Sequence, residues 1–188
     1  MSENLRVKSS QYIDETTRVS FKFNGTTYYG FKGDTLASAL LANNVHLVGR
    51  SFKYHRPRGI MTSGSEEPNA IVQINPNTNR TEPNVRATEV EIYEGMEASS
   101  QNCWPSVNFD IGGINNFLSP FFPAGFYYKT FMWPASFWEK YEYFIRHSAG
   151  LGKSPTLKDP DIYDHRNIHC DVLVAVSYTH LTLPTIVS

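Results

Sequence analysis

Apolar and polar side chains alternate near the start of the chain. Between residues 18 and 32 the sequence reads RVSFKFNGTTYYGFK, in which Val19, Phe21 and Phe23 fall on one side of an extended strand. The Asn-Gly pair that follows interrupts the alternation, and both residue types tolerate the positive φ of a tight hairpin turn. The pattern therefore predicts a two-stranded antiparallel ribbon.

The period of the apolar positions lengthens in the next stretch, GDTLASALLANNV, which covers residues 33–45. Leu36, Ala39 and Leu40 recur at the three- and four-residue spacing of one helix face. Asp34 is the predicted N-cap, because a carboxylate at this place can accept a backbone N–H of the first turn. The Asn-Asn pair predicts the stop, so a short helix follows the ribbon.

Two further strands are predicted, at Ala70–Ile74 and at Arg86–Tyr93, where apolar and β-branched residues recur. The sequence between them, NPNTNRTEPN, is rich in Asn, Thr and Pro and indicates a loop. A hairpin, a helix and further strands give the element order of a β-grasp domain. We therefore expect an α+β fold, with an N-terminal tail over 1–17 and a sheet wrapped on one helix over 18–95.

The composition changes after residue 95. From Met96 to Tyr128, prolines and a Gly-Gly pair interrupt an aromatic-rich stretch, which predicts a segment without long regular elements that drapes over another surface. A helix is then predicted in PASFWEKYEYFIRHSAGLG, because Phe137, Tyr141 and Ile145 recur at helical spacing and Gly150 suits the stop. We interpret its aromatic stripe as a packing face. With a polar linker, this extension covers 96–168.

The last apolar run, HCDVLVAV at residues 169–176, predicts a buried strand of the kind that begins a dinucleotide-binding domain. A glycine-rich turn that approaches a pyrophosphate normally follows such a strand. Here SYTHLTLPTIVS follows, without glycine and with Pro184, which stops a helix. We expect the first strand of a truncated Rossmann-type domain at 169–176 and a non-native tail at 177–188.

Composition limits the classes of function. The chain has 188 residues with 40% hydrophobic side chains, which is enough for a packed core. A net charge of −1 argues against a general nucleic-acid or membrane-surface protein. No segment approaches the roughly 18 apolar residues of a membrane span, and no signal-peptide core is evident, so we expect a cytoplasmic protein. Cys103 and Cys170 are expected to be reduced thiols.

Positive charge is nevertheless concentrated in one stretch, GRSFKYHRPRG at residues 49–59. In a turn-rich loop, Arg and Lys side chains can converge on a phosphate or a carboxylate. These basic residues are the candidate cofactor-binding or interface residues: Arg50, Lys53, His55, Arg56 and Arg58.

Two alternatives for this stretch remain open from the sequence. It can be a solvated surface loop that pairs with Glu66 and Glu67 of the same segment, since surface ion pairs are common and weak. It can also stack on nucleic acid through Phe52 and Tyr54, although no known nucleic-acid-binding motif surrounds them.

No catalytic or metal-binding constellation is readable from spacing. Of the six histidines, His165 and His169 lie four apart, but Asp164 and Asn167 in a polar linker argue against the helix that would bring them together. No Gly-x-Ser-x-Gly elbow occurs. The residues alone thus predict no catalytic residue and no metal ligand.

Seven longer motifs, taken together and in order, resemble a known family. They are GDTLASALLANNV, LVGRSFKYHRPRGI, EEPNAIV, SQNCWPS, PAGFYYKTFMWP, IRHSAGLG and CDVLVAV. They are similar to the N-terminal part of the α subunit of heterotetrameric sarcosine oxidase, over about residues 18–176.

The resemblance implies an enzyme that oxidatively demethylates sarcosine to glycine. The products with oxygen are hydrogen peroxide and formaldehyde, or methylene-tetrahydrofolate when tetrahydrofolate is the acceptor. The implied cofactors of the complex are FAD, FMN and NAD, and the implied partners are the β, γ and δ subunits. We expect this chain to serve subunit assembly and the flavin surroundings, without performing the reaction itself, and to bind neither nucleic acid nor a membrane.

Two alternatives accompany this interpretation. One is the α subunit of a related amine or amino-acid dehydrogenase of the hydrogen cyanide synthase kind, and the other is a non-catalytic interaction module. In those related α subunits, a similar domain carries cysteines that bind a [2Fe–2S] cluster after the PRG motif. Laid on that pattern, Thr62, Glu67 and Ala70 stand at former cluster-ligand positions. A third hypothesis is an iron–sulfur electron carrier. None of these three residues is a thiolate, so we expect no iron–sulfur cluster.

Overall fold

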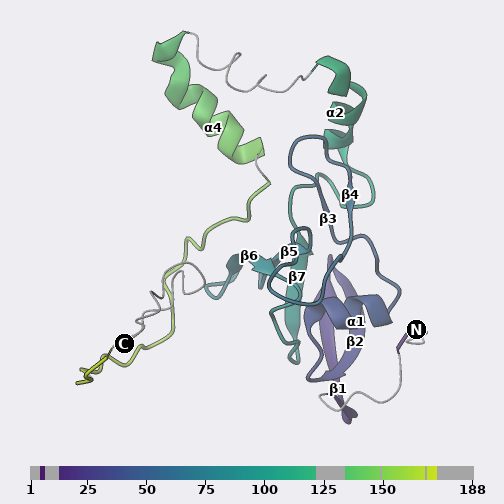
Figure 1. Cartoon of the computed structure of the whole chain (residues 1–188), viewed down its shortest axis with the longest axis vertical. Coiled ribbons are helices and arrows are strands. Elements are labelled where there is room, and N and C mark those ends of the chain that lie inside the picture. The colour runs from purple at the N-terminus through teal and green to yellow at the C-terminus, as the bar shows by residue number, and fades with distance from the viewer. Residues whose placement is uncertain (1–4, 7–12, 122–133, 149, 168, 173–188) are drawn as a thin grey trace, which may run out of the picture.

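The computed structural model describes residues 5–6, 13–121, 134–148, 150–167 and 169–172. Within them the chain forms an α+β fold built on a mixed five-stranded sheet in the order β2-β1-β7-β5-β6 (Figure 1). The strands are β1 (Asp14–Phe23), β2 (Thr26–Lys32), β5 (Ile71–Ile74), β6 (Glu82–Arg86) and β7 (Met96–Ser100). β1 and β7 are parallel, and the other neighbouring pairs are antiparallel.

The predicted ribbon is confirmed as the hairpin of β1 and β2. Val19, Phe21 and Phe23 are buried on its inner side, and they alternate with the less buried Ser20 and Lys22 as the pattern predicts. At the turn, Asn24 and Gly25 have φ values of 50° and 79°, the left-handed conformation that these two residue types adopt at low cost.

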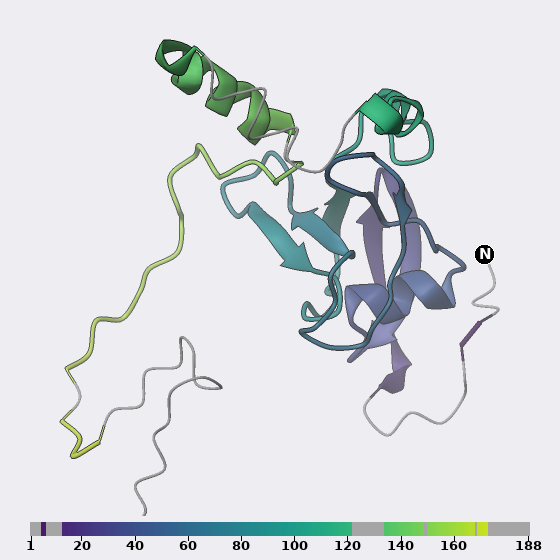
Figure 2. The same ribbon diagram turned by 45° about the horizontal axis from the view of Figure 1, so that its top comes forward.

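The predicted helix is confirmed as α1 (Leu36–Ala42), which lies across the sheet (Figure 2). The predicted cap is wrong by one residue: Thr35 is the N-cap, and its side chain accepts a hydrogen bond from Ser38 N. The Asp34 carboxylate is fully buried and accepts instead from Phe31 N at 2.9 Å, from Ser38 Oγ at 2.8 Å and from both terminal nitrogens of Arg6. It therefore ties the end of β2 to the helix and the N-terminal segment.

The predicted strand over Arg86–Tyr93 is wrong. β6 ends at Arg86, and the residues after it cover the N-terminus of α1, where backbone N–H groups lack partners within the helix. Leu36 N donates to Val90 O at 2.9 Å, and Ala37 N donates to Ala87 O at 2.8 Å. The segment therefore caps the helix with two of its carbonyls and makes only an isolated β-bridge, between Glu91 and Thr35.

A strand that the pattern did not reveal, β7, lies in the middle of the sheet between β1 and β5. The sheet thus continues past Gly95, where we expected the first domain to end. Met96 and Ala98 of β7 join the core between α1 and the sheet. The buried hydrophobic cluster consists of Val19, Phe21, Phe23, Leu36, Ala37, Ala39, Leu40, Val48, Ala70, Val72, Ile74, Ala87, Ile92, Met96 and Ala98.

The remaining elements are short, apart from one helix. They are β3 (Gly49–Arg50), β4 (Pro57–Arg58), η1 (Ile111–Gly113), α2 (Ile114–Phe117), η2 (Ser119–Phe121), η3 (Ala135–Phe137) and α4 (Trp138–Ser148). The lack of long elements before residue 122 and the helix near 134–152 are both confirmed. Residues 122–133, the second half of the predicted strand at 169–176 and the whole tail at 177–188 lie outside the described residues, and residues 169–172, which are described, form no strand.

The polar linker after α4 has no helix or strand over residues 151–167. It is attached to the sheet by Gln73 of β5, whose amide donates to Lys153 O at 3.0 Å and accepts from Lys153 N at 3.1 Å. A membrane crossing would need a helix longer and more apolar than any that the structure describes.

Candidate functional site

The basic loop (residues 49–58) stands on the two-stranded ribbon of β3 and β4, beside α2 (Figure 1). Backbone hydrogen bonds shape its tip: Ser51 N donates to Arg56 O at 2.9 Å, and His55 N donates to Ser51 O at 3.0 Å. His55 adopts a φ of 53°, which turns the chain back toward β4. The loop is therefore a hydrogen-bonded hairpin that carries the basic side chains.

Arg50 directs its guanidinium to the aromatic segment (residues 104–118). Its Nε and one terminal nitrogen donate to Val107 O at 2.8 and 2.6 Å, and the same terminal nitrogen reaches Asn108 O at 3.3 Å. Its other terminal nitrogen donates to His55 O at 3.2 Å. Arg50 thus joins the basic loop to the aromatic segment of its own chain.

His55 makes a second connection to the same segment. Its Nδ1 lies 2.7 Å from Asp110 Oδ2, and the Asp110 side chain is 1% exposed. The other oxygen of Asp110 accepts from Trp104 N and Gly112 N at 3.0 and 3.1 Å. A Cβ on Gly112 would lie 2.3 Å from His55 Nδ1, so only glycine allows this approach.

The other basic residues of the loop lie at its surface. Arg56 Nε donates to Asn116 Oδ1 at 2.8 Å, and its guanidinium stacks on the ring of Tyr54 at 4.8 Å from the centroid. Lys53 Nζ lies 5.0 Å from the centroid of the same ring. Arg58 is exposed in β4 and lines a hollow of about 480 Å³ together with Arg50.

Sequence reasoning found the basic residues but missed their partners. Val107, Asp110 and Asn116 all come from the aromatic segment, and their spacing carries no recognisable signal. The one indication was Asp110 itself, an acidic residue in a stretch that is otherwise aromatic, apolar and polar uncharged. Arg50, His55 and Arg56 therefore bind the aromatic segment of their own chain, whereas Lys53, Arg56 and Arg58 are exposed at the surface.

Thr62, Glu67 and Ala70, which the resemblance led us to expect at cluster-ligand positions, lie in the loop of residues 61–70. Glu67 is 1% exposed, and each of its carboxylate oxygens accepts two backbone N–H bonds. Oε2 accepts from Met61 N at 2.7 Å and Thr62 N at 2.6 Å, and Oε1 accepts from Asn69 N at 2.8 Å and Ala70 N at 3.1 Å. Glu67 therefore does not pair with the basic loop.

The ionisation of Glu67 follows from this geometry. Burial acts to raise the pKa of the carboxyl, but the backbone N–H donors of Thr62, Asn69, Met61 and Ala70 together hold the pKa below its usual range. The buried side chain is therefore a carboxylate at neutral pH.

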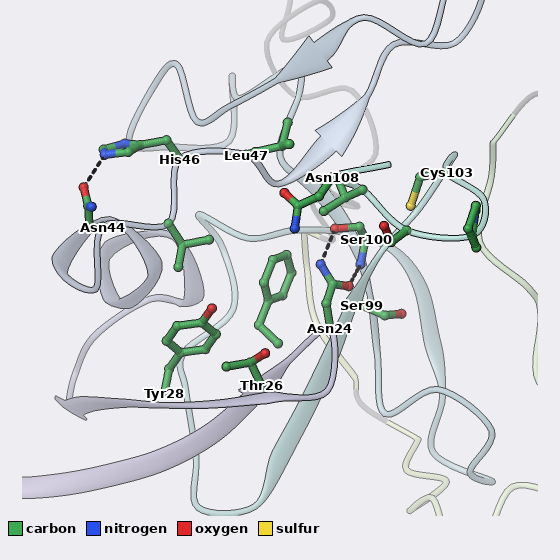
Figure 3. Close-up of a pocket in the computed structure, with 15 residues that line it drawn as sticks. Asn24, Thr26, Tyr28, Asn44, His46, Leu47, Ser99, Ser100, Cys103 and Asn108 are labelled. Atoms are coloured by element: carbon green, nitrogen blue, oxygen red, sulfur yellow. Dashed lines mark hydrogen bonds between the residues drawn. The ribbon is translucent and has the colours of Figure 1, made fainter. Parts of the chain in front are cut away.

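A groove of about 670 Å³ lies between the β1–β2 turn and the aromatic segment (Figure 3). On its floor Asn24 and Ser100 exchange two hydrogen bonds of 2.8 Å, and Cys103 points in from the side. Burial, and then the nearby Asp110 carboxylate, raise the pKa of the Cys103 thiol. The residues that line the groove include no Lys or Arg, and His46 is its one basic side chain.

Metal-ligating groups do not gather in the part of the chain that the structure describes. No set of three or more His, Cys, Asp or Glu side chains there could hold a metal ion. Cys103 is half-buried and Cys170 is exposed, and both are free thiols.

Comparison with known proteins places these features in a family context. The sequence profile of the 2Fe-2S iron-sulfur cluster binding domain matches residues 16–103. Sarcosine oxidase subunit alpha of Rhizobium meliloti (strain 1021) is 59% identical over 170 residues, which are 90% of this chain and 17% of the relative. The chain is homologous to the N-terminal region of sarcosine oxidase subunit alpha.

Two more distant relatives are also sarcosine oxidase alpha subunits. The sarcosine oxidase alpha subunits of Corynebacterium sp. strains U-96 and P-1 are each 28% identical, over 93% and 86% of this chain and 14% and 12% of the relatives. Among solved structures, L-proline dehydrogenase from P. horikoshii is 22% identical, with a TM-score of 0.38, over 50% of this chain and 17% of that one. The chain thus spans less than a fifth of the sarcosine oxidase alpha subunits that it matches.

The residues of this sarcosine oxidase alpha homologue do not fit the cluster that the domain profile names. A [2Fe–2S] cluster needs closely spaced thiolates, whereas the loop of residues 61–70, where the ligands were expected, contains no cysteine. The two cysteines of the chain lie outside this loop.

Proposed function

We propose that this chain is the leading part of a sarcosine oxidase α subunit and that it serves subunit assembly and the surroundings of the flavins. The whole complex would oxidatively demethylate sarcosine to glycine, with FAD, FMN and NAD as cofactors and with tetrahydrofolate as the acceptor of the one-carbon unit. The observation that carries this proposal is the 59% identity over 90% of the chain. We assign no step of the reaction to the residues of this chain.

The architecture supports an assembly role. The α+β sheet on one helix is the arrangement that we propose to be a β-grasp domain without its cluster. The aromatic segment exposes a series of large apolar side chains, and contiguous exposed apolar surface usually marks a contact site. These side chains are Trp104, Phe109, Ile111, Ile114, Phe117 and Leu118.

The basic loop adds positive charge near this apolar surface. The basic loop holds the aromatic segment in place through Arg50 and His55, while Arg56, which bonds Asn116 of that segment, and Arg58 of the same loop are exposed. Apolar area flanked by arginines is typical of the centre of a protein interface. We therefore propose that Arg56 and Arg58 meet an acidic face or an anionic group of the complex, with the β, γ and δ subunits as the candidate partners.

The proposal is tested in the complex that contains this chain within a full-length α subunit. The double variant Arg56→Ala/Arg58→Ala should assemble about tenfold more weakly or lose flavin, measured by co-purification and by flavin absorbance. The control is Arg80→Ala/Arg86→Ala, which removes the same charge from two exposed positions, one in the β5–β6 turn and one in β6. Unchanged assembly and flavin content in the first variant would reject the role of the basic loop.

Two measurements address the wider assignment. The complex should release hydrogen peroxide in a sarcosine-dependent manner, and a complex with no such activity would contradict the proposed reaction. Reading the encoding DNA past codon 176 should reveal a Gly-x-Gly-x-x-Gly turn. A natural reading frame without that turn would contradict the proposed continuation into an NAD-binding domain.

A further inference from the structure

The loop of residues 61–70 is buried at its base and ordered, although it lacks the ligands of the cluster that its family profile names. The spacing of Thr62, Glu67 and Ala70 is that of the plant-type C-x₄-C-x₂-C run. In a cluster-binding domain, the metal centre joins the two ends of such a loop, and metal binding is coupled to folding. Here another group has to make that connection.

The Glu67 side chain has the geometry to do so. One carboxylate oxygen binds the N–H groups of Met61 and Thr62 at the start of the loop, and the other binds those of Asn69 and Ala70 at its end. The middle of the loop is attached separately, because Thr88 Oγ donates to Gly64 O at 2.8 Å. The four bonds at the two ends of the loop thus converge on the single side chain of Glu67.

The charge of Glu67 is balanced by backbone dipoles. Among the described residues no salt bridge of Glu67 is found, and its four N–H donors form a concave group of the kind that binds anions. Hydrogen bonds to an ionised acceptor are stronger than neutral ones, and leaving such buried donors without an acceptor is costly. The loop is therefore an anion site that its own side chain fills.

We propose that the Glu67 carboxylate replaces the metal cluster as the group that organises this loop, so that the domain folds without metal. The site should consequently accept a free monocarboxylate when the side chain is removed. Acetate matches the atoms that the substitution Glu67→Ala deletes.

The test compares three variants of the full chain by thermal unfolding. Glu67→Ala should lower Tm by about 5–10 °C, because it removes the acceptor of four backbone N–H donors that are buried or part-buried. Glu67→Gln should also lower Tm, since its amide nitrogen cannot accept the N–H bonds of one end of the loop. The control Glu66→Ala removes an exposed carboxylate next to it and should stay within about 2 °C of the parent chain.

Rescue by added acetate separates an anion site from a simple loss of packing. Acetate, compared with chloride at the same ionic strength, should raise the Tm of Glu67→Ala and leave that of the parent chain and Glu66→Ala unchanged. A Tm of Glu67→Gln equal to that of the parent chain, or an equal response of all variants to acetate, would overturn the proposal.

Measurements on the unmodified chain keep the proposal falsifiable if Glu67→Ala does not fold. Hydrogen exchange should show protection of the amides of Met61, Thr62, Asn69 and Ala70 in purified protein that contains no iron by metal analysis. Rapid exchange of these four amides, or stoichiometric iron in the folded protein, would show that the carboxylate does not organise the loop.

Discussion

Replacing Arg50 with Ala tests how the basic loop and the aromatic segment are joined. Arg50 supplies N–H donors to the carbonyls of Val107, Asn108 and His55, and the two bonds to Val107 are short, at 2.8 and 2.6 Å. The substitution removes the donors and leaves these carbonyls in place. A change at this residue therefore acts on the connection and not on the core of the sheet.

The expected loss follows from the nature of these bonds. A hydrogen bond from a charged donor contributes about 1.5–3 kcal/mol, and a half-buried site allows water to replace part of it. The bonds act on one guanidinium, so their energies do not add in full. We expect the free energy of unfolding to fall by about 2–3 kcal/mol, with Arg50→Lys recovering little because an ammonium cannot reproduce the planar fork.

Two measurements separate local from global effects. Urea unfolding reports the total change, and hydrogen exchange of residues 104–118 reports detachment of the aromatic segment alone. The matched control is Arg58→Ala, an exposed arginine of the same loop without a recorded hydrogen bond to the aromatic segment. Equal stability and equal exchange in both variants would refute the assignment of Arg50 as the connecting residue.

Two other predictions concern single positions. Gly112→Ala should cost about 1–3 kcal/mol in urea unfolding, because the new methyl group would meet the His55 ring, whereas Gly113→Ala, with open space at its Cβ, should cost far less. If both cost the same, the close approach to His55 is not what requires glycine. The Thr16 hydroxyl and other donors lower the pKa of Asp14 to about 2, so this carboxylate should titrate near pH 2 by NMR. The contribution of the ionised Asp14 to stability is present above the ordinary pKa of 3.8 and is lost as the pH falls toward 2. Thr16→Ala should move the midpoint of the Asp14 titration back up. An unmoved midpoint would contradict the Thr16 hydroxyl as the cause of the low pKa.

Local patterns predicted the local parts of the fold. The hairpin and α1 follow from period-two and helical spacing with turn residues between them, and neither needs distant residues to form. Residues 87–92 misled the same reasoning, because apolar alternation is also what a segment shows when it covers the end of a helix. β7 escaped notice because Met, Glu, Ala and Ser have no marked preference for strands, and its position between two partners decides its conformation.

The candidate site was also predictable only where local sequence determines it. Charge density identified the basic loop, but the target of Arg50 lies far along the chain in a segment without a spacing signal. Likewise, sequence placed Glu67 at a ligand position, yet only the three-dimensional loop shows both of its oxygens turned to backbone N–H groups. The direction of a side chain at such a position depends on the conformation of the whole loop, which the sequence pattern does not predict.

The position of β7 has a consequence for how the chain folds during synthesis. β7 is the last strand of the sheet to be made, yet it lies at the centre, where Phe21 of β1 pairs with Met96. Until that strand leaves the ribosome, the inner edges of β1 and β5 have no neighbour, and open strand edges invite association with other chains. Pairing between residues so distant in sequence is slow. A nascent chain that stalls before residue 96 is therefore expected to need chaperone protection, whereas one released after residue 100 can close its own sheet.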